Sequence, residues 1–106
     1  MTSIVIPNSV TSIGSSAFVS CSSLTSITIP DSLTSIGPLA FYGCSSLESI
    51  IISDSITNVG DYAFSECNLL KTVYYTGTEE QWNSIVISSV GNKALTNASI
   101  IYNYEG

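Results

Sequence analysis

The 106-residue sequence has no histidine and little charge of either sign, with Asp, Glu, Lys and Arg making up only 9% of its residues. Lys71 and Lys93 are its two basic residues, and the formal net charge is -6. Because no basic patch exists to neutralise phosphates, nucleic acid and anionic membrane surfaces are excluded as expected partners. Because histidine is missing, the ordinary catalytic triads cannot be built.

Long apolar runs are also missing. No stretch approaches the roughly 20 residues that a membrane-spanning helix needs, and no signal peptide opens the chain. We therefore expect no membrane insertion.

Cysteine is scarce. Cys21, Cys44 and Cys67 have no C-x-x-C spacing, which argues against a metal site. Their common repeat position favours a column of buried free thiols, and a disulfide between neighbouring copies is the alternative.

The chain does contain a unit that recurs every 23 residues, seen most fully from Ile27 to Leu47. A fixed period of this length is typical of a solenoid, in which each repeat buries its apolar face against its neighbours. Equivalent residues form columns, among them Ile4, Ile27, Ile50 and Val73; Ile6, Ile29, Ile52 and Tyr75; and Leu24, Leu47 and Leu70. The chain starts in the middle of a repeat, so we expect it to be a piece of a longer array.

The repeat unit begins with I-x-I-P in two copies and has Ser53 in place of proline in the third. Its apolar residues two apart predict a short strand, which Pro7 or Pro30 ends. Asn8, Asp31 and Asp54 follow, where a side chain can bond the backbone two residues on and close a turn. A calcium site is the alternative, but one oxygen-bearing side chain per repeat is too few for it.

Glycine then marks a bend in each repeat, and we expect Gly14, Gly37 and Gly60 at positive φ. The segment after each glycine, S-S-A-F-x-x-C-x-x-L in the first copy, has apolar residues three apart. This spacing predicts a short helix or 3₁₀ turn.

The aromatic column of the repeat, Phe18, Phe41 and Phe64, predicts an interior stack of rings. A cofactor-binding aromatic box is the alternative, but the rings recur at the same phase with no polar partner beside them. We expect the strands to stack in parallel about 4.8 Å apart, and the coil to be right-handed.

The pattern changes after the strand that starts at Val73. Thr78 and Gln81 have the spacing of a capping box, with Glu79 and Glu80 in the first turn of the predicted helix. An acid–base role for this adjacent carboxylate pair is the alternative, although neighbours in a helix point about 100° apart.

Beyond that helix start, Trp82 should lie over the end of the core. Alternation at Ile85 and Ile87 predicts a strand, residues 90–92 a turn, and residues 98–104 a last strand. We interpret residues 1–76 as about three repeats, the first one truncated, and residues 77–106 as a C-terminal cap.

The repeat unit I-x-I-P-x-S-[VLI]-T-S-I-G-x-x-A-F-x-x-C-x-x-L resembles the BspA-like (treponemal) leucine-rich repeats of bacterial and some protozoan surface proteins. The ending YYTGTEEQWNSI…NASIIYN is similar to the C-terminal segment of that family. The resemblance implies an α/β solenoid with parallel strands on one side and helical or 3₁₀ turns on the other. It also implies a secreted or cell-surface protein engaged in adhesion or protein contact, without enzymatic activity.

Strand periodicity forces residues beside the inward isoleucines to face out. The outward rows are Ser3, Ser26, Ser49 and Thr72, and Val5, Thr28, Ile51, Tyr74 and Ile101. From these we take Thr28, Ser49, Ile51, Thr72, Tyr74 and Ile101 as candidate binding residues. The alternative is that β-branched and aromatic residues stand there only because they favour strands.

The leading functional hypothesis is a non-enzymatic module that binds a protein or glycan on a host or neighbouring cell. A structural spacer and terminator without its own ligand is the alternative, and an enzyme is a third class. No cofactor is expected. The first strand has no cap, so self-association through that end is a further expectation. Asn97-Ala98-Ser99 fits a glycosylation sequon, relevant only in a eukaryotic secretory context.

Overall fold

A computed structural model of the chain describes residues 2–6, 8–16 and 18–105, with side chains from Ile6 onward. Expectations that rest on Pro7, or on the side chains of Ser3, Ile4 and Val5, lie outside the described residues. In chain order the elements are β1 (Thr2–Val5), β2 (Leu24–Thr28), β3 (Ser35–Ile36), β4 (Ser49–Ile52), β5 (Asn58–Val59), β6 (Thr72–Tyr75), α1 (Glu79–Ser84), β7 (Val86–Ile87), α2 (Lys93–Thr96) and β8 (Ser99–Ile101).

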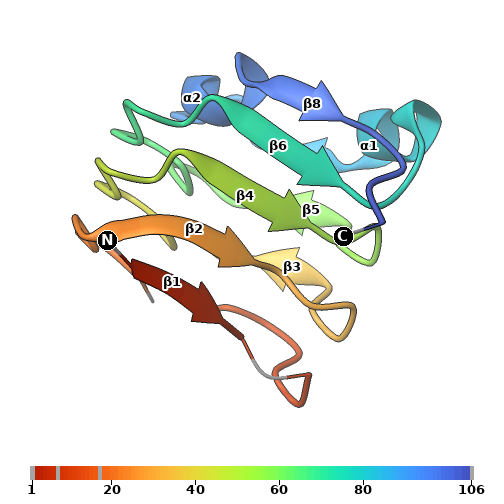
Figure 1. The fold of residues 1–106 in the computed structure, drawn as a ribbon, viewed down its shortest axis with the longest axis horizontal. Helices are drawn as coiled ribbons and strands as arrows, with labels where there is room; N and C mark the ends of the chain where they lie inside the picture. Colours follow the sequence, from red (N-terminus) through yellow and green to blue (C-terminus); the bar gives the residue numbers. More distant parts are fainter. Residues whose placement is uncertain (1, 7, 17, 106) are drawn as a thin grey trace.

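The strands predicted for the repeats and for the C-terminal end form one parallel sheet in the order β1-β2-β4-β6-β8 (Figure 1), whereas the strand predicted at Ile85 and Ile87 is β7 of a second sheet. Equivalent repeat positions are direct partners, since Ile27 pairs with Ile50 and Ile50 with Val73. The register extends beyond the repeats, because Val73 pairs with Ile100 of the last strand. The 23-residue period therefore translates directly into parallel strand pairing.

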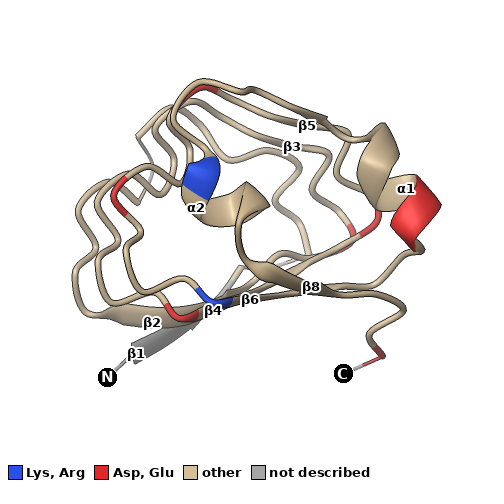
Figure 2. Ribbon diagram, turned by 90° about the horizontal axis from the view of Figure 1, so that it is seen from above, with Lys and Arg blue, Asp and Glu red and all other residues tan. Residues whose placement is uncertain are grey.

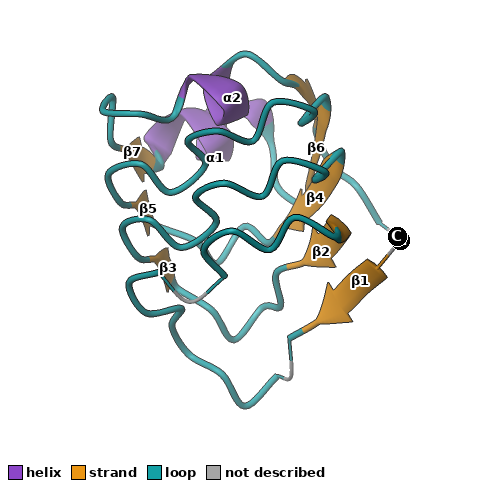
Figure 3. Ribbon diagram, turned by 90° about the vertical axis from the view of Figure 1, so that its left-hand side faces the viewer, coloured by secondary structure: helices purple, strands orange, loops and turns teal. Residues whose placement is uncertain are grey.

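A second parallel sheet, β3-β5-β7, was not predicted by the sequence. Figure 3 shows it on the side of the molecule opposite the five-stranded sheet. Its members are two residues long, and each carries one apolar residue of a core column: Ile36 pairs with Val59, and Val59 with Ile87. Ile13 adds an isolated bridge to Ile36. The apolar residue before each glycine thus joins a short ladder that closes the core.

The predicted interior stack of phenylalanines is confirmed. The ring centroids of Phe18 and Phe41 are 5.2 Å apart, as are those of Phe41 and Phe64. Phe41 and Phe64 are fully buried, while Phe18, in the first repeat, is partly exposed. Burying one such ring stabilises the fold by roughly 1.5–3 kcal/mol.

The helical or 3₁₀ turns predicted after each glycine are present as single 3₁₀-type turns. Cys21 N donates to Phe18 O at 3.3 Å and Leu24 N to Cys21 O at 3.1 Å, which are single 3₁₀-type bonds. The N–H of Phe18 instead donates to Ala40 O in the next repeat, at 2.7 Å. Bonds between repeats therefore interrupt each helical turn after one step.

The prediction of positive φ at Gly14, Gly37 and Gly60 is wrong. Left-handed backbone occurs two and six positions later, at Ser16, Leu39 and Tyr62 and at Ser20, Gly43 and Glu66. Close contact between repeats explains the glycine instead: a Cβ on Gly37 would lie 2.7 Å from Ile13 O, and one on Gly60 would lie 2.6 Å from Pro38 N.

The turns after β2 and β4 differ from the prediction that Asp31 and Asp54 bond the backbone two residues on. Serine takes this role, since Ser55 N donates to Ser53 Oγ at 3.2 Å. The Asp31 carboxylate instead accepts from Ser53 Oγ at 2.7 Å, and Asp54 N donates to Thr76 Oγ1 at 2.9 Å. The aspartates thus link neighbouring repeats; Asn8 has no such bond among the described residues.

Serine and threonine hydroxyls of these turns also join one repeat to the next. Ser32 Oγ donates to Val10 O at 2.6 Å, and the equivalent Ser55 Oγ donates to Leu33 O at 2.5 Å. Thr57 Oγ1 donates to Thr34 O at 3.1 Å. Satisfied hydroxyls therefore line the turn side of the molecule.

The C-terminal segment follows the prediction at first. Helix α1 has the full capping box between Thr78 and Gln81. Trp82 packs against the core and meets Tyr75 edge to face, with ring centroids 5.1 Å apart.

Helix α2 was not predicted. It is preceded by the buried Asn92, whose side chain accepts from Phe64 N at 3.1 Å and donates to Gly60 O and Ser88 O at 3.0 and 2.9 Å. Asn92 thereby satisfies the N–H of Phe64, whose equivalent one repeat earlier, Phe41 N, donates to Ala63 O of the next repeat. The last strand ends at Ile101, three residues earlier than predicted, because Asn103 adopts φ 56.

Candidate binding face

The outward rows of the five-stranded sheet lie side by side as predicted, and we call their described residues the outer face. Strand pairing aligns Ser26, Ser49 and Thr72 in one row and Thr28, Ile51, Tyr74 and Ile101 in the other. Ile101 is 45% exposed, and the others are partly exposed. The structure thus brings the six candidate binding residues together on one surface; their role in binding stays a prediction.

Hydroxyl groups on the outer face are unpartnered. Within the described residues, Ser26, Ser49, Thr72 and Thr28 form no side-chain hydrogen bond, whereas the turn hydroxyls bond neighbouring repeats. A free hydroxyl can both donate and accept a hydrogen bond. The outer face therefore offers a row of unused donors and acceptors.

Tyr104 belongs to the outer face, although the sequence did not indicate it. Its ring centroid lies 4.6 Å from that of Tyr74, at an interplanar angle of 42°. Tyr104 N donates to Tyr75 O at 3.0 Å, which fixes the segment beside β6. Figure 2 shows the chain after β8 turning back at the outer side of the sheet.

The left-handed backbone at Asn103 explains why Tyr104 was missed. A strand continued to residue 104 would put Tyr104 on the same inward side as Ile100 and Tyr102. A positive φ breaks that alternation, and asparagine adopts it more readily than most residues. The available signal was the asparagine, not the periodicity.

The outer face carries no charge. The sequences of β2, β4, β6 and β8 are LTSIT, SIII, TVYY and SII. Glu48 and Lys71 come directly before β4 and β6, and Glu105 follows Tyr104. Charged groups thus flank the face at the ends of its strands without entering either row. This arrangement suits a neutral ligand better than an ionic one.

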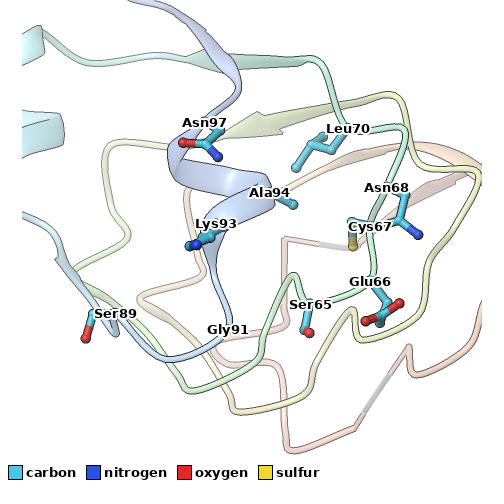
Figure 4. Close-up of a pocket in the computed structure, with 10 residues that line it drawn as sticks. All are labelled: Ser65, Glu66, Cys67, Asn68, Leu70, Ser89, Gly91, Lys93, Ala94 and Asn97. Carbon is cyan, nitrogen blue, oxygen red and sulfur yellow. The ribbon is translucent and has the colours of Figure 1, made fainter.

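A separate hollow of about 560 Å³ lies between α2 and the turn that leads into β6 (Figure 4). Ala94 of α2 and Asn97, directly after α2, line one side of it, and Cys67 and Leu70 line it from the turn (Figure 4). Its remaining lining residues are Ser65, Glu66, Asn68, Ser89, Gly91 and Lys93. Asn97, the sequon asparagine, is exposed at this hollow.

The cysteine column contributes the only thiol among the residues that line this hollow. Cys67 Sγ donates to Phe41 O at 3.1 Å, and Cys44 Sγ donates to Phe18 O at 3.2 Å. The adjoining Cys44 thiol and burial raise the pKa of Cys67, so its thiol stays protonated near neutral pH. All three cysteines are free thiols.

Other charged groups have structural surroundings. Glu79 and Glu80 are exposed in the first turn of α1, where negative charge favours the helix dipole. Among residues 2–6, 8–16 and 18–105, no three His, Cys, Asp or Glu side chains gather in a way that could hold a metal ion. In the same residues, neither helix is long and apolar enough to cross a membrane.

Comparison with known proteins places these features in a family. The family model described as "BspA type Leucine rich repeat region" matches residues 1–104, in six copies. No curated protein matches the chain.

Two solved structures are similar to the chain. The leucine-rich repeat protein of T. pallidum is 26% identical, with a TM-score of 0.65 over 69% of this chain and 40% of that one. A leucine-rich cell surface protein of Faecalibacterium prausnitzii is 29% identical, with a TM-score of 0.43 over 82% of this chain and 35% of that one. The chain thus spans about two fifths or less of either protein.

The parallel strand register, the stacked phenylalanines and the full-length family match agree with one another. The chain belongs to the BspA-type leucine-rich repeat family.

Proposed function

We propose that this chain is a non-enzymatic binding module of a bacterial cell-surface leucine-rich repeat protein, and that it contacts a protein or a glycan through the outer face. The observation that carries the proposal is the grouping of Ile51, Tyr74, Ile101 and Tyr104 beside a row of unpartnered hydroxyls. An aromatic pair beside aliphatic side chains on a preformed sheet has the composition of a contact patch.

The family supports a surface location, because the repeat unit resembles the BspA-like repeats of bacterial surface proteins. The structural surroundings of Glu79 and Glu80 in the first turn of α1 support a non-enzymatic role.

Binding of the purified chain to a panel of extracellular-matrix proteins, host-surface proteins and immobilised glycans tests the proposal. The Ile51→Ser, Tyr74→Ser double variant removes apolar area from the outer face while keeping both residues small enough for the sheet. We expect saturable binding by the parent chain and its loss in this variant.

Val86→Ser is the matched control, because Val86 is 70% exposed on β7 of the other sheet. It should bind like the parent chain. Absence of saturable binding across the panel would contradict the proposal and favour the spacer and terminator role. Circular dichroism of each variant establishes that a loss of binding is not a loss of fold.

A further inference from the structure

We infer that the ligand of the outer face is an extended, β-linked, neutral polysaccharide that lies across the strands; this inference rests on the proposed function. Three properties of the face carry it: the spacing of its rows, the free state of its hydroxyls and its lack of charge. Each property concerns residues whose side chains the structure describes.

The spacing of the rows suits a linear polymer. Ser26, Ser49 and Thr72 are direct partners on successive parallel strands, so their hydroxyls recur about every 4.8 Å across the sheet. This distance is close to the length of one sugar unit in an extended β-linked chain. Successive sugars can therefore meet successive strands in the same way.

The second row runs alongside the first. Thr28, Ile51 and Tyr74 are two residues further along the same strands, which separates the rows by about 6.7 Å. A sugar ring laid across both rows at β4 or β6 meets the hydroxyl of Ser49 or Thr72 on one side and the side chain of Ile51 or Tyr74 on the other. Sugars present the same combination, with polar edges and an apolar C–H face.

The hydroxyl row has the wrong composition for a protein partner. Serine is depleted in protein–protein interfaces, where arginine and large aromatic residues supply most of the affinity. The turn hydroxyls of this chain show that its serines bond neighbouring repeats where structure requires it. Ser26 and Ser49 make no such bond within the described residues and remain available to a ligand.

The aromatic end of the face supplies the apolar contact. Tyr74 and Tyr104 lie 4.6 Å apart, and both rings are partly exposed. A tyrosine ring offers an apolar surface together with a hydroxyl, which matches both features of a sugar. Because β2, β4, β6 and β8 contribute no charged side chain, a charged polysaccharide gains nothing from the face.

Isothermal titration with cellohexaose and xylohexaose, which are β-linked and neutral, tests the inference. Maltohexaose, which is α-linked and curved, is the matched ligand control. We expect binding of at least one β-linked hexasaccharide and binding of maltohexaose weaker on the order of tenfold or more. Equal binding of α- and β-linked chains would overturn the inference.

Variants locate the site. Tyr74→Ser, Tyr104→Ala and Ser49→Val should each weaken binding of the β-linked ligand. Tyr74→Phe, which keeps the ring, and Val86→Ser, which lies on the other sheet, are the controls and should bind like the parent chain. Full binding by Tyr74→Ser and Tyr104→Ala would overturn the inference, provided that both retain the parent's circular dichroism. Tyr104→Ala changes the C-terminal segment alone, so it remains informative if Tyr74→Ser fails to fold.

The result separates this inference from the proposed function. If a protein of the panel binds through Ile51 and Tyr74 while no neutral hexasaccharide binds, the polysaccharide assignment is wrong and the binding module stands. If neither class binds, both are wrong.

Discussion

The ring of Phe41 stacks on the ring of Phe64, with centroids 5.2 Å apart and planes 15° apart. Phe18 stacks on the other side of Phe41 at the same centroid distance. The middle ring therefore loses contacts on two sides when it is truncated. We expect Phe41→Ala to lower the free energy of unfolding by about 3–5 kcal/mol, measured by urea denaturation.

Phe18→Ala is the comparison within the same column. Phe18 is partly exposed and has one described ring neighbour, so its truncation should be less destabilising than that of Phe41. Equal losses from the two variants would contradict the view that the column is a continuous interior stack.

Glycine is required in the repeat by close approach, which predicts unequal effects along one column. A Cβ on Gly60 would lie 2.6 Å from Pro38 N, whereas no atom of the described residues lies within 4 Å of a Cβ on Gly14. We expect Gly60→Ala to cost about 1–3 kcal/mol and Gly14→Ala to have little effect on thermal unfolding. Similar effects of both substitutions would contradict close contact between repeats as the reason for glycine.

Glu66 holds a left-handed backbone with φ 64, at the repeat position that Gly43 occupies one unit earlier. A non-glycine residue costs about 1–2 kcal/mol in this conformation. Glu66→Gly relieves this strain, but the greater conformational entropy of glycine in the unfolded chain offsets part of the gain. We therefore expect Glu66→Gly to raise the free energy of unfolding by up to about 1 kcal/mol. Glu66→Ala removes the charge but keeps the Cβ, so it should give no such gain in urea denaturation.

Stability should fall at high pH because of Tyr75. Burial, and secondarily the Asp54 carboxylate, raise the pKa of the Tyr75 hydroxyl above its usual 10.0. The unfolded chain then releases this proton before the folded one, so the contribution is complete below about pH 10 and is lost as pH rises further.

Tyr75→Phe removes this titration while keeping the ring against Trp82. The free energy of unfolding should fall between about pH 9 and pH 11 by less in Tyr75→Phe than in the parent chain. Parallel pH profiles of the two proteins would show that Tyr75 does not contribute.

β1 is an edge strand of the five-stranded sheet, so its outer backbone groups have no strand partner in that sheet. Edge strands of this kind pair with other chains unless they are charged or covered. We expect concentration-dependent association in light scattering, weakened by Thr2→Lys, which places charge on this edge. A strict monomer at high concentration would contradict the prediction.

Much of the fold was predictable because the period of the sequence equals the register of the sheet. Once Ile27, Ile50 and Val73 align as direct partners, the inward and outward rows follow from strand alternation. The six candidate binding residues were found together for this reason.

The remaining features depend on contacts that no period encodes. Phe18 N bonds Ala40 O in the next repeat, which limits the predicted helical or 3₁₀ segment to a single turn. Asn92 and Tyr104 lie in the non-repeating end, where one buried amide and one left-handed residue decide the arrangement. Neither effect has a sequence signal stronger than the presence of an asparagine.

The turn hydroxyls have a consequence for the conditions that the molecule tolerates. Ser32, Ser55 and Thr57 join successive repeats through bonds between neutral groups. Dissolved ions screen attraction between charges, and acid discharges carboxylates, but neither alters a hydroxyl that donates to a carbonyl. The bonds that these three hydroxyls make between repeats are therefore insensitive to salt and to mild acidity.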